Sequence, residues 1–167
     1  CKGSIFEVNF AESADGTTGD TNEGSGVFES LIGGEMVVSS NFVTFISSDP
    51  RRGEINSAHG EYTPDGKASP ASPGSTSAMK WYTAEAEKPQ YSGDNGKNRR
   101  YIRYAEVVLM YAEALNECGF GARALTELNK TKAIADKIVG SPEPYQACGY
   151  TAMRDNIWNE RRAELAF

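Results

Sequence analysis

The most constraining feature of the sequence is the spacing of its apolar residues after residue 100. From Tyr101 to Cys118 apolar residues recur every three or four positions, while charged residues gather on another face. This spacing is typical of an amphipathic α-helix, which repeats every 3.6 residues. Gly119 is a common kind of helix stop, so a helix is expected over about 101–118. The residues expected to face inward are Tyr101, Tyr104, Ala105, Val108, Tyr111, Ala112 and Leu115.

The same periodicity continues in two further stretches. A second helix is expected over about 122–139, ended by Gly140 and Pro142, and a third over about 152–167. Because only a short glycine-containing segment joins the first two helices, they are expected to form an antiparallel hairpin. The residues expected to face inward are Ala124, Leu125, Leu128, Thr131, Ala135 and Ile138 in the second helix, and Met153, Ile157, Trp158 and Leu165 in the third.

The predicted hairpin has the character of a tetratricopeptide repeat, a unit of about 34 residues built from two helices. Ala112 and Ala124 fit the small positions where the two helices approach closely. The first helix also has a second apolar stripe, formed by Ile102, Leu109 and Ala112. This stripe implies contact with more than one neighbour, because a repeat unit cannot bury both of its faces alone.

The first hundred residues have a different character. Alternating apolar and polar residues predict a strand over Ser4 to Phe10, and Met79 to Thr83 is predicted to be another short strand. Two short apolar runs lie between them, Met36 to Val38 and Phe42 to Ile46, and Pro50 closes the second. Stretches rich in glycine, proline and small polar residues predict long loops between these elements. The predicted loops cover residues 11–26, 60–78 and 88–98.

The sequence therefore predicts a mainly α fold. A tetratricopeptide-like helical hairpin plus a further helix is expected over residues 101–167. A loop-rich, irregular α+β segment with a few short β-strands is expected over residues 1–100. Long loops in a compact domain are usually functional, so the loops of the first segment are expected to face a ligand.

Composition argues against several classes of protein. The net charge of −6 opposes nucleic-acid binding, because proteins that bind nucleic acids carry a clustered excess of positive charge. The sequence has no run of about 18 uncharged apolar residues of the kind that crosses a membrane. Cys1, Cys118 and Cys148 form no Cys-x-x-Cys pair, so neither a disulfide framework nor a zinc site is indicated.

One stretch of the first predicted helix is highly specific. Residues 103–117 read RYAEVVLMYAEALNE, which resembles the signature of the SusD/RagB family. The same family has an alanine-led helix with a Leu-Asn pair, matched by residues 124–130, and a helix with Glu-Arg-Arg-x-Glu-Leu-Ala-Phe, matched by residues 160–167. Weaker landmarks are matched, in the right order, at residues 4–8, 49–51 and 80–81.

The resemblance implies that the chain is a C-terminal piece of one larger SusD-like domain, because family members begin with a long helical part. It also implies a non-enzymatic, cell-surface lipoprotein of the outer membrane. Such a protein captures oligosaccharides, or peptides in some branches, and delivers them to a SusC-like TonB-dependent transporter. It would contact the membrane only through a lipid anchor that lies outside this chain.

Residues for a metal-dependent or nucleophilic enzyme are scarce. His59 is the only histidine, so a zinc hydrolase lacks ligands, and a serine or cysteine nucleophile lacks a supported base. We therefore expect no catalytic residues, no metal and no cofactor.

A glycoside hydrolase is the enzymatic alternative, because it needs only two carboxylates. Glu106 with Glu113, and Glu160 with Glu164, each share one face of a predicted helix. Nearby arginines favour ion pairs for these acids instead of catalysis. The arginines concerned are Arg103, Arg161 and Arg162.

Sugar capture requires exposed aromatic rings that stack on pyranoses, with polar side chains that bind hydroxyls. The candidate ligand-binding residues are the loop-bordering aromatics Tyr62, Trp81, Tyr82 and Tyr91 and the polar residues Asp15, Asp20 and Asn22. Trp81 also fits a buried place in its predicted strand. Tyr104, Tyr111 and Leu115 are expected to be structural. The non-enzymatic alternative is a tetratricopeptide-type module that binds a partner protein or peptide.

Overall fold

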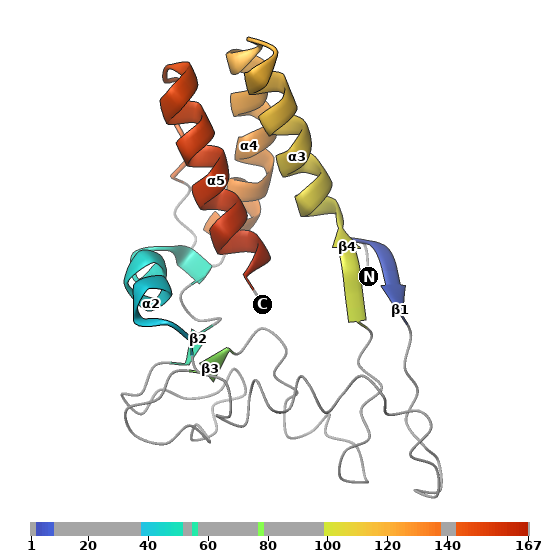
Figure 1. The fold of residues 1–167 in the computed structure, drawn as a ribbon, viewed down its shortest axis with the longest axis vertical. Coiled ribbons are helices and arrows are strands. Elements are labelled where there is room, and N and C mark those ends of the chain that lie inside the picture. Colours follow the sequence, from blue (N-terminus) through green and yellow to red (C-terminus); the bar gives the residue numbers. More distant parts are fainter. Residues whose placement is uncertain are drawn as a thin grey trace, which may run out of the picture. The chain divides into compact units, whose positions relative to one another are not determined.

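The computed structural model describes residues 3–8, 38–51, 55–56, 77–78, 99–137 and 143–166, and the structural statements below concern these residues (Figure 1). The chain divides into two compact units. The helical unit comprises residues 1–6, 49–51 and 101–167, and the second unit comprises residues 7–48 and 52–100.

Three helices build the helical unit: α3 (Tyr104–Glu117), α4 (Gly121–Asp136) and α5 (Tyr150–Leu165). They lie side by side, each in contact with the other two (Figure 1). The predicted mainly α fold, with a helical hairpin and a further helix, is confirmed, and α4 and α5 begin within two residues of their predicted starts. Among the described residues, none of the helices is long and apolar enough to span a membrane.

The link between α3 and α4 explains where the first helix ends. Gly119 has a φ of 80°, in the left-handed region that glycine adopts without strain. The Phe120 N–H donates to the Leu115 carbonyl at 2.8 Å, and the Gly119 N–H donates to the Asn116 carbonyl at 3.0 Å. These two bonds form a Schellman motif, which satisfies carbonyls at the helix end. The predicted stop at Gly119 is therefore confirmed.

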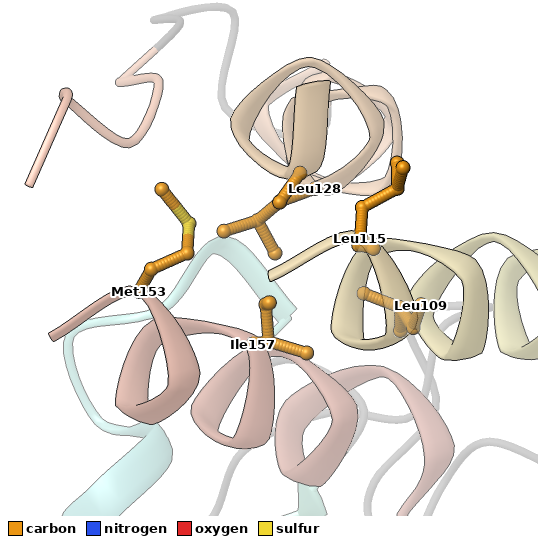
Figure 2. Packing of buried hydrophobic residues seen from close by; sticks show 7 residues of the cluster. Leu109, Leu115, Leu128, Met153 and Ile157 are labelled. Carbon is orange, nitrogen blue, oxygen red and sulfur yellow. The ribbon is translucent and has the colours of Figure 1, made fainter. Parts of the chain in front are cut away.

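The hydrophobic core of the unit lies where the three helices meet. Figure 2 shows the larger side chains of this core, Leu109 and Leu115 from α3, Leu128 from α4, and Met153 and Ile157 from α5. Ala112 and Ala124 belong to the same cluster and are fully buried. Their small side chains fit a place where backbones approach closely.

The predicted start of the first helix, near residue 101, is wrong. Residues Arg99–Arg103 form the strand β4, which pairs with β1 (Ser4–Val8), and α3 begins only at Tyr104. The Tyr104 N–H donates to the Gly3 carbonyl at 2.8 Å, and the rings of Phe6 and Tyr101 lie 5.9 Å apart. These pairings run in opposite directions along the chain, so the ribbon is antiparallel. Tyr101 and Ile102, expected inside a helix, are therefore exposed strand residues.

Three large side chains that were expected to be buried are on the surface. Tyr104, Tyr111 and Trp158 are 55%, 45% and 51% exposed. For the two tyrosines the reason is that α3 packs against α4 and α5 at once, with Leu109 and Ala112 in the middle of its buried face. Successive helical residues are about 100° apart, so the tyrosines fall on the flank of this face.

The second unit contains a short helix, α2 (Ser40–Ile46), and two short strands, β2 (Ile55–Asn56) and β3 (Ser77–Ala78). The strands are antiparallel. The apolar run from Phe42 to Ile46 is thus helical, which the sequence analysis did not anticipate. Ser39 caps this helix by accepting from the Phe42 N–H at 3.3 Å, and Phe42 and Ile46 are buried one turn apart. The predicted strand from Met79 to Thr83 lies outside the described residues.

Candidate functional site

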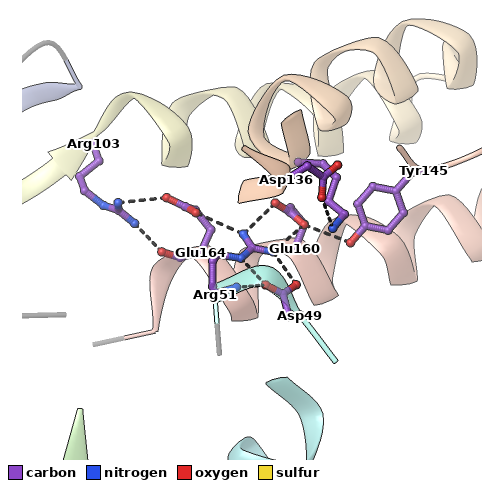
Figure 3. Close-up of polar contacts among 8 residues, drawn as sticks. Asp49, Arg51, Arg103, Asp136, Tyr145, Glu160 and Glu164 are labelled. Atoms are coloured by element: carbon purple, nitrogen blue, oxygen red, sulfur yellow. Dashed lines mark hydrogen bonds and ion pairs between the residues drawn. The ribbon is translucent and has the colours of Figure 1, made fainter. Parts of the chain in front are cut away.

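A buried polar cluster lies within the helical unit (Figure 3). We call it the arginine network, and it comprises Asp49, Arg51, Arg103, Tyr145, Glu160 and Glu164. Arg51 is 2% exposed and Glu160 is fully buried. Buried charges are costly unless they are paired and hydrogen-bonded, so the bonds of these two residues decide whether the cluster is stable.

Arg51 stands at the centre of the network and donates five hydrogen bonds. Its Nη1 and Nη2 donate to the two carboxylate oxygens of Glu160, at 2.9 and 3.1 Å. Its Nε and Nη2 donate to the two oxygens of Asp49, at 2.8 and 2.9 Å, and Nη1 also reaches Glu164 at 3.2 Å. A guanidinium has five N–H donors, so Arg51 is fully used. The paired bonds to Glu160 and to Asp49 fix the orientation of the Arg51 side chain and balance its charge.

Glu160 has a third donor in Tyr145, from the segment that joins α4 to α5. The Tyr145 hydroxyl donates to Glu160 at 3.1 Å. The backbone of Tyr145 is held by Asn129 of α4, which accepts from the Tyr145 N–H at 2.9 Å and donates to its carbonyl at 3.0 Å. The buried Glu160 carboxylate of α5 is therefore linked to Arg51 and to the segment that contains Tyr145, which is itself held by Asn129 of α4.

Glu164 extends the network to the start of α3. One of its oxygens accepts from Arg51, and the other accepts from Arg103 Nη1 at 3.0 Å. Arg103 Nη2 also donates to the backbone carbonyl of Glu164. Arg103 is the last residue of β4 and precedes α3, so this contact fixes the strand-to-helix junction to the end of α5.

The pKa values of the network follow from burial and pairing. Burial alone would raise the pKa of Asp49, but the hydrogen bonds and charge of Arg51 together outweigh it and hold that pKa below its usual value. Burial would lower the pKa of Arg51, but its bonds to Asp49 and Glu160 raise that pKa instead. Burial raises the pKa of the Tyr145 phenol, and the charge of Glu160 raises it further. Arg51 therefore stays charged and Tyr145 stays neutral across the physiological range.

The arrangement joins separate parts of the helical unit to one another. Both oxygens of each of the three carboxylates, Asp49, Glu160 and Glu164, accept hydrogen bonds from the protein itself. A general acid or base must instead face a substrate proton. Among the described residues, no group of three or more histidine, cysteine, aspartate or glutamate side chains could hold a metal ion.

The ion pairs expected for Glu160 and Glu164 are present. Arg103 was among the expected partners, but Arg51 was not, although the Asp-Pro-Arg motif that contains it had been noted. Tyr145 was also missed, because nothing in its local sequence sets it apart. In the other acidic pair, Glu106 and Glu113, Glu113 accepts from the Trp158 indole N–H at 2.9 Å.

The predicted ligand-binding residues form a separate group. All seven lie outside the described residues, so their proximity stays a prediction. They are Asp15, Asp20, Asn22, Tyr62, Trp81, Tyr82 and Tyr91.

Comparison with protein families identifies the family of the chain. The model of the SusD family matches residues 48–167, which include the Asp-Pro-Arg motif, all three helices of the helical unit and the whole arginine network. The chain belongs to the SusD family. The resemblance drawn from residues 103–117 is thereby confirmed.

The fold agrees with this membership. A SusD-like protein from Bacteroides fragilis NCTC 9343, solved by crystallography at 2.70 Å resolution, is similar with a TM-score of 0.63 and 20% sequence identity. The similarity covers 99% of this chain and 41% of that protein, so the chain spans less than half the length of the SusD-like structure it matches. A comparison with curated proteins finds no match.

Proposed function

We propose that the protein captures oligosaccharides at the outer cell surface, without cleaving them, and delivers them to a SusC-like TonB-dependent transporter. The observation that carries this proposal is the SusD family match over residues 48–167. The similar fold of a SusD-like protein supports it further.

The chemistry of capture is assigned to the loops of the first hundred residues. Tyr62, Trp81, Tyr82 and Tyr91 supply flat apolar faces for sugar rings, and nearby aspartate and asparagine side chains supply acceptors and donors for hydroxyls. In this proposal the helical unit is the scaffold. A rigid scaffold that carries variable loops is a common arrangement for binding proteins.

The absence of turnover in this proposal is supported by how the helical unit uses its acids. The carboxylates of the arginine network are fully engaged by guanidinium and phenol donors. The pair of Glu160 and Glu164, one of the two acidic pairs considered for a glycoside hydrolase, thus has structural partners.

The transporter and the membrane location belong to the same proposal. The protein would be held on the outer membrane by a lipid anchor and would act beside the transporter. A glycan released from the loops would then enter the transporter without diffusing away.

The experiment is a calorimetric titration of the intact protein with a panel of oligosaccharides. Tyr62→Ala and Tyr91→Ala should each weaken binding at least about fivefold, which corresponds to about 1 kcal/mol for one stacked ring. Tyr104→Ala is the matched control, because Tyr104 is an exposed tyrosine of the scaffold. It should leave the affinity unchanged.

Other results would favour other functions. Equal losses for the loop variants and for Tyr104→Ala would contradict the assignment to the loops. Binding to a peptide panel and to no sugar would favour the tetratricopeptide-type interaction module. New reducing ends in the titration cell would indicate a glycoside hydrolase.

A further inference from the structure

A row of three side chains, two exposed aromatic residues and a half-buried arginine between them, runs along α5. Tyr150, Arg154 and Trp158 follow one another at every fourth position, so they share one face of the helix. The Arg154 guanidinium carbon lies 5.8 Å from the centre of the Tyr150 ring and 5.0 Å from that of Trp158. We call these three residues the aromatic ladder. The backbone positions of Tyr150 and Trp158 are about 12 Å apart along the helix axis, and the two rings lie closer together than that, because both approach the Arg154 guanidinium.

The polar ends of both rings are fixed by α3. The Tyr150 hydroxyl donates to Glu117 at 2.6 Å, and the Trp158 indole N–H donates to Glu113 at 2.9 Å. Glu113 and Glu117 are themselves one turn apart on α3. Each ring is thus held by a hydrogen bond at its edge and by the cation between the two rings.

The two rings of the ladder remain open to solvent although both are held by contacts within the protein. Tyr150 is 48% exposed and Trp158 about as much. Exposed aromatics that are already held in place lose little side-chain freedom on binding, which favours affinity. The carboxylates at the ring edges also have capacity for further donors, because a carboxylate accepts several hydrogen bonds and each is seen to accept one here.

We propose that the aromatic ladder is a second glycan-contact site, which binds a neutral oligosaccharide long enough to reach from one ring to the other. This inference rests on the proposed function. Sugars have apolar ring faces that stack on Tyr150 and Trp158, and hydroxyls that donate to Glu113 and Glu117.

The charge of the ladder and its supporting carboxylates favours neutral glycans over anionic ones. Two carboxylates and one guanidinium leave the ladder and its supports with a formal charge of −1, so sulfated or uronic-acid chains are disfavoured. Charge also argues against a protein helix as the occupant. Such a helix would remove water from Glu113, Glu117 and Arg154 without replacing its hydrogen bonds, which is costly, whereas glycan hydroxyls replace them.

The test compares short and long neutral oligosaccharides on the intact protein. Trp158→Ala should lower the affinity for the long chains about tenfold, a factor that corresponds to about 1.4 kcal/mol, and should leave the short chains unaffected. Trp158→Phe keeps a ring and should lose less. Phe120→Ala is the matched control, because Phe120 is also exposed and lies under an arginine, Arg123, at 5.7 Å. It should change neither affinity, and thermal unfolding checks that each variant is folded.

The outcomes separate the two proposals. If Trp158→Ala binds long and short chains like the wild type, or weakens both equally, the ladder is not a second site, while the proposed function stands. If it impairs co-purification with the transporter and leaves glycan binding intact, the ladder is a protein interface and the inference is wrong. If the wild type binds no glycan of either length, the proposed function itself fails.

Discussion

Arg51 donates from every N–H of its guanidinium, and its partner Glu160 is 109 residues away in the sequence. Both side chains are buried, so neither can exchange its partner for water. A lysine could supply the charge but not the two forks, because its ammonium is a single point of donation. The structure of the helical unit thus depends on one residue that lies outside its three helices.

Removing Arg51 should therefore be severe. Arg51→Ala leaves the Glu160 carboxylate buried without its main partner, and we expect the free energy of unfolding to fall by about 3–5 kcal/mol. Urea unfolding of the intact protein measures this. Arg100→Ala is the control, because Arg100 is a partly exposed arginine whose ion pair with Glu7 spans 3.8 Å. It should cost less than about 1 kcal/mol.

A double-mutant cycle separates pairing from packing. With Glu160→Gln in place, Arg51→Ala should cost less than in the wild type, because the one fully buried carboxylate is no longer charged. Additive losses would mean that the two side chains do not stabilise each other.

Asp49 should make stability depend on acid pH. Its pKa is lower in the folded protein than its ordinary value near 3.8. The unfolded chain therefore takes up this proton first as the pH falls, so the stabilisation is complete above about pH 4 and is lost below it. Melting temperatures measured between about pH 6 and pH 3 should fall less steeply for Asp49→Asn than for the wild type. Equal slopes would show that Asp49 is not a source of the acid sensitivity.

At the scale of the helices, α3 is the central element because its contacts with α4 and with α5 are both more extensive than the contact between α4 and α5. Its buried face is formed by Val108, Leu109, Ala112 and Leu115, and its tyrosines lie to the side. Truncating one of these tyrosines should therefore lower the free energy of unfolding much less than truncating a core side chain, because a half-exposed ring buries less surface.

Leu128→Ala and Tyr111→Ala test this division. Leu128 is fully buried between the helices, so its truncation should cost about 2–5 kcal/mol. Tyr111 is half-exposed and accepts one surface hydrogen bond from Arg123 at 2.9 Å, so its truncation should cost about 1 kcal/mol or less. Chemical unfolding of both variants gives the comparison. A larger loss for Tyr111→Ala would place the tyrosine in the core after all.

The helices were predictable because local periodicity and stop signals specify them. α4 and α5 follow a clear 3.6-residue pattern, and Gly119 ends α3 by a local motif. β4 was not predictable in this way, since Tyr101 and Ile102 continue the helical spacing and become strand only by pairing with β1. The α2 helix is only seven residues long, too short for periodicity to identify.

At the scale of the whole molecule, the chain combines a helical unit and a second unit that contains most of the first hundred residues. The family could be inferred from the sequence because its signature is a contiguous run of residues within α3. The arginine network could not, since its members come from four separate places in the chain and only folding brings them together. The division of the chain into a scaffold and capture loops remains a proposal.

Capture without cleavage is the central claim, and equilibrium dialysis followed by mass spectrometry tests it most directly. A neutral oligosaccharide is dialysed against the intact protein at about equal concentrations, and the sugar is then recovered from both sides. The account predicts an excess of sugar on the protein side, with every molecule at its original length. An even distribution across the membrane, or shortened products on either side, would contradict it.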